Sequence, residues 1–186
     1  DAIFASTFKV NFGGYAEYKC LPENGTLALK PANLTYEEAA AVPGAGMTAL
    51  HCLKKANIRR GQKVLIYGAS GAVGTNAVQI AKHFGAEVTG VCSTRNLDLV
   101  REIGADHVID YTQEDCTRNG QQYDVVFDAV GKLNPAHGKK ALKQGGVYLN
   151  VHKDSDGGEK LENLFLLREL IEAGEINPAI DRCYPF

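Results

Sequence analysis

A glycine-rich turn near the middle of the chain joins a short apolar segment to an amphipathic one. Residues 63–67 read Lys-Val-Leu-Ile-Tyr, and residues 68–74 read Gly-Ala-Ser-Gly-Ala-Val-Gly. Apolar residues then recur at helical spacing until Gly85, a residue type that commonly follows the end of a helix. The order therefore predicts a strand, a turn and a helix over 72–84, which is how a nucleotide-binding βαβ unit begins.

The turn has the spacing of the dinucleotide-binding fingerprint, with Ala69 in the place of the first glycine. In this interpretation Gly71 lets a pyrophosphate approach the backbone, and Gly74 lets the helix pack on the strand. The free N–H groups and the positive end of the helix dipole hold the negative charge. A nucleoside-triphosphate loop would need a lysine directly after the last glycine, where the chain has Thr75. A purely structural glycine turn, or a site for another nucleotide class, is the alternative.

Strand and helix patterns alternate from residue 63 to residue 151. Strands are predicted at 64–67, 87–92, 107–111, 123–130 and 147–151, and helices at 72–84, 96–103 and 136–142. This alternation indicates a parallel sheet with helices on both faces. The predicted fold class is α/β, with a doubly wound parallel sheet.

The flanking segments follow other patterns. Residues 1–30 are short β-rich pieces, including an alternating strand over 12–21. Helices are predicted at about 35–42, 44–57 and 161–173, a loop at 152–160, and strand-like and turn-like pieces at 176–186. Because the β-rich pieces are too few to enclose a core, we expect the chain to be part of a longer protein.

Composition excludes several classes of partner. The formal net charge of −2 argues against a nucleic-acid or anionic-membrane surface, and no apolar run approaches the length of a membrane span. The five cysteines are scattered and show no close-pair spacing. Reduced thiols in a cytoplasmic protein fit that distribution better than disulfides.

The segment after the second predicted strand indicates which dinucleotide is bound. Sites that prefer NAD place an acidic residue there to bind the ribose 2′-hydroxyl, and none follows Cys92. The same absence disfavours a methyl-donor site. Ser93, Thr94 and Arg95 instead offer hydroxyl and guanidinium donors, which suit a 2′-phosphate. The pattern favours NADPH, the alternative being that a hydroxyl caps the next helix and Arg95 is only solvated.

Taken together, the motifs resemble the medium-chain dehydrogenase/reductase superfamily, and most closely its zinc-free quinone oxidoreductase branch. They cover nearly the whole chain in the family's order: 13–18, 30–35, 37–43, 47–50, 67–74, 99–111, 123–131, 171–174 and 180–185. The resemblance implies a Rossmann domain over 31–175. Residues 1–30 would be the tail of a GroES-like substrate domain, and residues 176–186 the start of its returning segment. It also implies a homodimer, and a further sheet strand between Val151 and Leu161, where this chain is short.

The resemblance also assigns cofactor-binding residues. It places Thr48, Asn150 and Val151 near the nicotinamide, and it places Ser93, Arg95 and Tyr111 around the 2′-phosphate. At the pyrophosphate it places Ser70, Gly71, Ala72, Val73 and Gly74, and beside the adenosine it places Val130 and Gly131. For Tyr111 the alternative is packing on the sheet, and for Thr48 a bond to its own helix. His152 is read as a loop residue that could lie near the nicotinamide.

The activity implied is hydride transfer from NADPH to a small-molecule carbonyl, either a quinone or another α,β-unsaturated carbonyl. No catalytic residue is assigned. Zinc-dependent members carry a ligand four residues before the threonine that Thr48 matches, and this position is Gly44. No zinc site is therefore expected. A zinc-type alcohol dehydrogenase and a non-catalytic NADPH-binding or redox-sensing protein are the alternatives.

Overall fold

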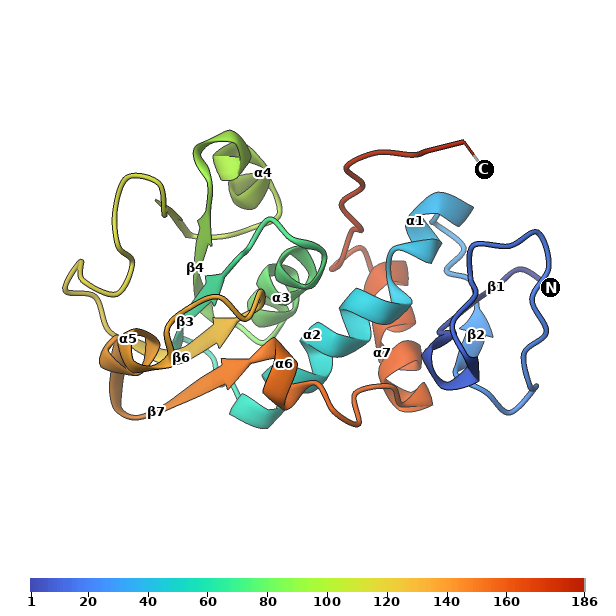
Figure 1. The fold of residues 1–186 in the computed structure, drawn as a ribbon, viewed down its shortest axis with the longest axis horizontal. Coiled ribbons are helices and arrows are strands. Elements are labelled where there is room, and N and C mark those ends of the chain that lie inside the picture. Colours follow the sequence, from blue (N-terminus) through green and yellow to red (C-terminus); the bar gives the residue numbers. More distant parts are fainter. Residues whose placement is uncertain (186) are drawn as a thin grey trace.

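Five parallel strands form the main sheet of the computed structural model, which describes residues 1–185 (Figure 1). Their spatial order is β5 (His107–Asp110), β4 (Glu87–Cys92), β3 (Lys63–Tyr67), β6 (Tyr123–Asp128) and β7 (Leu142–Asn150). Each neighbouring pair is parallel, so the predicted doubly wound sheet is confirmed. Because the chain progresses in opposite directions from β3, the carboxyl ends of β3 and β6 form the switch point where such sheets bind ligands.

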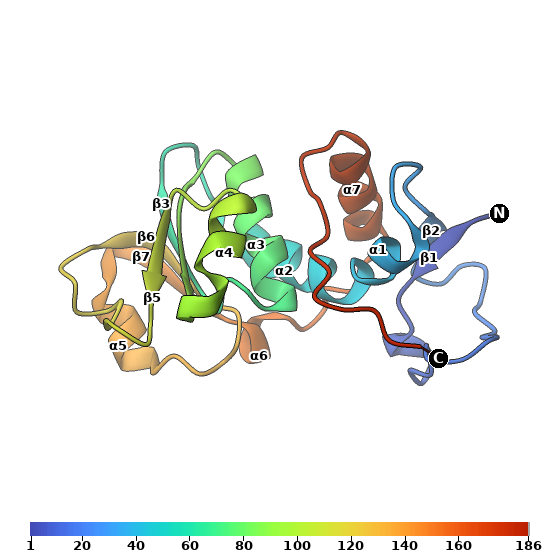
Figure 2. The same cartoon turned by 90° about the horizontal axis from the view of Figure 1, so that it is seen from above.

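The strand β3 is apolar without alternation because both faces of the sheet are covered. Val64, Leu65 and Ile66 are fully buried, as expected for a central strand of a parallel sheet. Helices α2 (Pro43–Ala56), α3 (Ala72–His83) and α4 (Leu97–Glu102) pack on one face. The other face is covered by α5 (Pro135–Lys140) and the segment 111–122 (Figure 2).

A second, two-stranded sheet lies at the end of the molecule away from α5 (Figures 1 and 2). It pairs β1 (Ile3–Ala5) with β2 (Leu27–Leu29) in antiparallel register, Phe4 opposite Ala28. Both of these residues are buried in the same core as the helices, which explains why so small a sheet persists. Between the two sheets lie α2 and α7 (Leu161–Glu172). The remaining elements are η1 (Phe8–Val10), α1 (Tyr36–Ala40), η2 (Thr94–Asn96) and α6 (Val151–Asp154).

The helix starts follow from local chemistry. Thr35 and Glu38 form a reciprocal capping box at the start of α1, with the Glu38 N–H donating to Thr35 Oγ1 over 3.2 Å. Pro43 occupies the first turn of α2, where its missing N–H has no helical partner to lose. Within the described residues, none of the helices is long and apolar enough to cross a bilayer.

Several predicted elements are wrong. Residues 12–21 form no strand: Asn11, Phe12 and Gly13 all have positive φ and turn the chain, and Tyr15 and Tyr18 point into solvent. An alternating pattern becomes a strand only when another strand pairs with it, and none does so among the described residues. The segment 176–185 also lacks strands, and residue 186 lies outside the described part. Val151 opens the helix α6, so the predicted 152–160 loop begins as a helix and the strand before it ends at Asn150.

The segment after α7 is fixed to α3 by one side chain. Gln79 Oε1 accepts from the Asn177 N–H at 2.8 Å, and Gln79 Nε2 donates to the Asn177 carbonyl at 3.0 Å. Ile176 is fully buried beside this pair. His83, on the same helix, also contacts the Glu175 carboxylate. The segment that follows α7 therefore runs along the outer side of α3.

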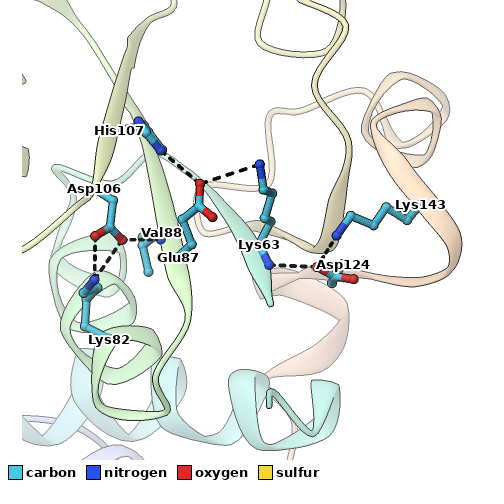
Figure 3. Close-up of polar contacts among 8 residues, drawn as sticks. All are labelled: Lys63, Lys82, Glu87, Val88, Asp106, His107, Asp124 and Lys143. Atoms are coloured by element: carbon cyan, nitrogen blue, oxygen red, sulfur yellow. Dashed lines mark hydrogen bonds and ion pairs between the residues drawn. The ribbon is translucent and has the colours of Figure 1, made fainter. Parts of the chain in front are cut away.

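Polar side chains connect the amino-terminal ends of the strands (Figure 3). Asp106 accepts from Lys82 Nζ at 2.7 and 2.8 Å and from the Val88 N–H at 2.7 Å. Asp124 accepts from the Lys63 N–H and from Lys143 Nζ, both at 2.7 Å. This edge is opposite the carboxyl ends of the strands, so its polar network serves the sheet and not the ligand site.

The network predicts a loss of stability in acid. Burial alone would raise the pKa of Asp106 and Asp124, but the hydrogen bonds from Lys82 and Lys143 and from backbone N–H groups outweigh it, so both pKa values lie below the ordinary one. Stability from a lowered carboxyl pKa is present above the unfolded pKa of about 4 and is lost as the pH falls through the folded value. We therefore expect the free energy of unfolding in urea to fall between about pH 5 and pH 3.

The double variant Asp106→Asn/Asp124→Asn tests this explanation. Because neither amide titrates, its unfolding free energy should change less over the same pH range than that of the original chain. An equally steep decline in both proteins would show that other carboxylates cause the acid sensitivity.

Candidate functional site

The turn between β3 and α3 is held against the neighbouring strand. The N–H groups of Gly68 and Ala69 both donate to the Val91 carbonyl, at 3.0 and 2.9 Å. Gly68 has φ +82°, and a Cβ placed there would lie 1.9 Å from Val130 Cγ2. The left-handed residue of the turn is thus Gly68, one position before Ala69, and this explains how alanine can stand where the fingerprint has its first glycine.

Gly71 and Gly74 have different roles in this turn. A Cβ on Gly74 would lie 2.0 Å from the Gly68 carbonyl oxygen, so only glycine allows α3 to pack against the turn. A Cβ on Gly71 would meet only that oxygen, at an ordinary 3.5 Å. Gly71 and Ala72 are exposed, whereas Gly74 is buried. The surface above Gly71 is therefore open to an incoming group.

The first turn of α3 offers unpaired donors at this opening. Its N-cap, Gly71, provides no side-chain acceptor, so the N–H groups of Ala72, Val73 and Gly74 have no partner within the helix. Helix α3 has 12 residues, and the positive end of its dipole faces the same way. An anion at the switch point would be stabilised by these groups.

The loop after β4 carries the predicted 2′-phosphate donors. Ser93 is half-buried, and Arg95 is exposed on η2. Thr94 Oγ1 donates to Asp110 Oδ2 at 2.5 Å, and Asp110 Oδ1 accepts from the Thr112 hydroxyl at 2.7 Å. These hydrogen bonds, with that from Thr94 the strongest, hold the pKa of Asp110 below its ordinary value. Asp110, at the end of β5, is a residue of this region that sequence reasoning missed.

Tyr111 lies beside the same edge of the sheet. Its side chain is 52% exposed, and its ring centroid is 6.4 Å from that of Tyr67 at the end of β3. The two rings line a hollow of about 270 Å³ that also contacts α5. Cys116, in the wall of this hollow, is not a reactive thiol, because burial raises its pKa to about 11. The ring therefore has one side against Tyr67 at the end of the sheet, as in the predicted packing alternative, and another side open to solvent.

A buried carboxylate organises the loop after β6. Asp128 is fully buried, and it accepts from three backbone N–H groups: Val130 at 3.2 Å, Gly131 at 2.8 Å and Leu133 at 2.9 Å. Asn150 Nδ2 donates to the same carboxylate over 3.2 Å. Asp128 thus positions two predicted site residues, Val130 and Gly131, and connects them to a third. Sequence reasoning missed it, although an acid ending an apolar strand was the available signal.

The end of β7 turns directly into α6. Asn150 Oδ1 accepts from the His152 N–H at 3.0 Å, which caps this short helix. The exposed His152 ring covers Gly131, because a Cβ built on that glycine would lie 2.1 Å from His152 Cδ2. Asn150, Val151, Gly131 and His152 therefore meet at the carboxyl ends of β6 and β7.

Thr48 lies in the second turn of α2. Its hydroxyl donates to the Gly44 carbonyl at 2.8 Å, which is the predicted alternative of a bond to its own helix. Gly44 itself faces Phe8, whose Cε2 would be 3.4 Å from an added Cβ. Phe8, Gly44 and Tyr36 are part of the lining of a hollow of about 670 Å³ between the N-terminal segment and the α1–α2 corner.

The described residues do not fit a zinc site. Gly44 has no side-chain donor, and a phenyl ring occupies the space in front of it. In residues 1–185 there is also no group of three or more His, Cys, Asp or Glu side chains that could hold a metal ion. No metal-dependent step is assigned to this part of the chain.

Comparison with known proteins gives a consistent set of relatives. Residues 72–174 match the family model described as zinc-binding dehydrogenase. The 2-methylene-furan-3-one reductase of Solanum lycopersicum is 40% identical over 187 residues, covering 94% of this chain and 47% of that protein. The chloroplastic NADPH-dependent alkenal/one oxidoreductase of Arabidopsis thaliana is 36% identical with the same coverage. This chain thus spans about half the length of these relatives.

A solved structure of similar fold is the quinone oxidoreductase from Coxiella burnetii. The two chains superpose with a TM-score of 0.67 and 26% sequence identity, over 83% of this chain and 55% of the other. The overall fold described above is therefore shared with this structure.

Proposed function

Because this chain belongs to the medium-chain dehydrogenase/reductase superfamily, we propose that it is the nucleotide-binding part of an NADPH-dependent reductase of quinones or other α,β-unsaturated carbonyls. One observation carries the proposal. The uncapped first turn of α3, open at Gly71, faces the switch point beside a loop whose donors, Ser93 and Arg95, have no acidic residue among them.

In this proposal each part of the carboxyl edge holds one part of the cofactor. The N–H groups of Ala72, Val73 and Gly74, with Ser70 and the open backbone of Gly71, bind the pyrophosphate. Ser93, Arg95 and Tyr111 surround the 2′-phosphate. The adenosine rests on Val130 and Gly131. Near the nicotinamide lie Asn150, Val151 and Thr48.

When bound, the nicotinamide ring supplies the hydride, and the protein supplies orientation and electrostatics. Asp128 contributes by holding Gly131 and Asn150 in one arrangement, which pre-organises the edge on which the ring rests. No proton donor is named among the described residues. The substrate would approach from the side of α2, where the hollow beside Gly44 opens.

The names of the relatives support the substrate class. A 2-methylene-furan-3-one and an alkenal or alkenone all have a carbon–carbon double bond conjugated to a carbonyl. The name of the structural neighbour adds quinones, in which the same conjugated unit lies within a ring. Each of these accepts a hydride at an electrophilic carbon, so one arrangement of the cofactor serves all of them.

We further propose the domain division expected from the sequence. Residues 31–175 form the Rossmann domain, residues 1–30 belong to a GroES-like substrate domain, and residues 176–186 begin its returning segment. The antiparallel β1–β2 sheet fits a remnant of such a domain. A homodimer and a cytoplasmic location are also proposed. Size-exclusion chromatography with light scattering would test the first of these, and fractionation of source cells the second.

Cofactor titration followed by turnover assays tests the function. We expect the chain, and the longer protein that contains it, to bind NADPH more tightly than NADH. Arg95→Gln should weaken NADPH binding about tenfold or more and leave NADH binding nearly unchanged, because only NADPH has the 2′-phosphate. The longer protein should then oxidise NADPH with an alkenal or a quinone.

Three results would contradict this proposal. Preference for NADH would remove the roles of Ser93 and Arg95. Tight NADPH binding without turnover of any enone or quinone would favour a non-catalytic binding protein. Turnover of a simple alcohol that depends on added zinc would favour the zinc-type alcohol dehydrogenase.

A further inference from the structure

Asn96 stands at the N-cap position of α4, but its side chain does not cap that helix. It is the residue that precedes α4, and asparagine is among the best residues at such a position because its side chain accepts from the first helical N–H groups. In this chain its side chain makes no hydrogen bond to that helix. The amide is instead directed toward the turn between β3 and α3.

The Asn96 amide connects two parts of the proposed cofactor site. Its Nδ2 donates to Ser70 Oγ at 3.0 Å and, more weakly, to Ser93 Oγ at 3.4 Å. Ser70 belongs to the glycine turn and Ser93 to the loop after β4, so the amide adds a side-chain link to the backbone hydrogen bonds that join the turn to Val91. Asn96 is half-buried between them.

The direction of these hydrogen bonds determines what the serines can offer. A hydroxyl has one proton to donate and two lone pairs that accept. Because the amide N–H groups fill a lone pair on each oxygen, the hydroxyl protons of Ser70 and Ser93 stay available. Both serines are then set to donate to an acceptor that lies outside the protein, such as a phosphate oxygen.

Thr94 shows the opposite arrangement next to them. Its hydroxyl proton is donated to the Asp110 carboxylate, so Thr94 is not available as a donor. Thr94 and Asn96 together fix the loop at two points, one on β5 and one on the glycine turn. Among the hydroxyl groups of Ser70, Ser93 and Thr94, Asn96 contacts the two that do not donate to Asp110.

We propose that Asn96 is a positioning residue that selects for the phosphorylated dinucleotide by holding the Ser93 hydroxyl as a donor to the 2′-phosphate. Through the same amide it holds the Ser70 hydroxyl as a donor to the pyrophosphate, which both dinucleotides share. This inference rests on the proposed function and assigns to the site a residue that makes no phosphate contact of its own. The residue acts through the serines, so its effect must depend on them.

The test compares NADPH and NADH affinities of the full chain and its variants, measured by nucleotide fluorescence. In Asn96→Asp only acceptors remain, so the serine hydroxyls donate their hydrogen bonds to the carboxylate, and its negative charge opposes the 2′-phosphate. The ratio of the NADH to the NADPH dissociation constant should fall about tenfold or more. Asn96→Ala frees the hydroxyls to rotate, and its ratio should fall only a few-fold. Asn119→Asp, the same change in an exposed loop, should leave the ratio unchanged.

A double-mutant cycle separates positioning from a structural role. Asn96→Ala should have no further effect on the ratio in a Ser70→Ala/Ser93→Ala background, because the groups on which it acts are gone. The inference would be overturned if Asn96→Ala kept its full effect in that background, or if a folded Asn96→Asp variant had an unchanged ratio. In either case, NADPH binding by the original chain would still support the proposed function. Failure of the original chain to bind either nucleotide would overturn both. Thermal unfolding of each variant establishes that it is folded.

Discussion

Gly74→Ala is expected to destabilise the chain by about 3 kcal/mol or more and to abolish NADPH binding. The added methyl group would lie 2.0 Å from the Gly68 carbonyl oxygen and 2.8 Å from Ala69 Cα. Both are backbone atoms of a turn that is hydrogen-bonded to β4, so neither can move without lifting α3 from the sheet. Urea unfolding would measure the first effect and nucleotide titration the second.

Gly71→Ala is the matched control, three residues away in the same turn. Its methyl group would meet only one atom, at 3.5 Å, and Gly71 has φ −83°, which alanine adopts freely. We expect its unfolding free energy to stay within about 0.5–1 kcal/mol of the original while NADPH binding weakens, because the methyl group occupies the open surface above the turn. Equal destabilisation by the two substitutions would contradict the different roles assigned to these glycines.

Asp128→Ala is expected to lower the unfolding free energy by about 3–4 kcal/mol. It removes the common acceptor of three backbone N–H groups and the Asn150 amide, and all of them are left without a partner in or near the core. The loop that carries Val130 and Gly131 should become mobile, so NADPH affinity should fall as well. Urea denaturation gives the stability, and hydrogen exchange at the Gly131 amide reports the loop.

Asp98→Ala provides the comparison on the surface. Its side chain is 90% exposed and pairs with Arg101 at 2.8 Å, an arrangement of small net effect on stability. We expect a change within about 0.5 kcal/mol. If Asp128→Ala were as mild, the Asp128 carboxylate would not be the group that holds the loop together.

The central βαβ unit was predictable because its signals are local. A strand, a glycine turn and a helix with Gly85 after it are consecutive in the chain, and the residues of each element contact one another. The same holds for the other four strands, whose apolar runs are short and bounded by turn residues. Boundaries were less accurate: Leu142 was assigned to a helix and begins β7.

The parts of the site that sequence reasoning missed depend on partners distant in the chain. Asp128 matters because Asn150 reaches it from β7, and Asp110 because Thr94 reaches it from η2. Asn96 resembles an ordinary helix cap until Ser70 is seen beside it. Residues 12–21 were misassigned for the converse reason, since their alternation has no partner strand among the described residues.

The hydrogen bonds between Gln79 and Asn177 connect the segment that follows α7 to the helix α3. This helix extends over about 18 Å. Its first turn is the proposed phosphate-binding site, and the outgoing segment lies along its later turns. Any rotation of the residues beyond Asn177 must either break both of those bonds or carry the helix along. Movement of the segment that follows α7 is therefore coupled, through α3, to the position of the first turn of that helix.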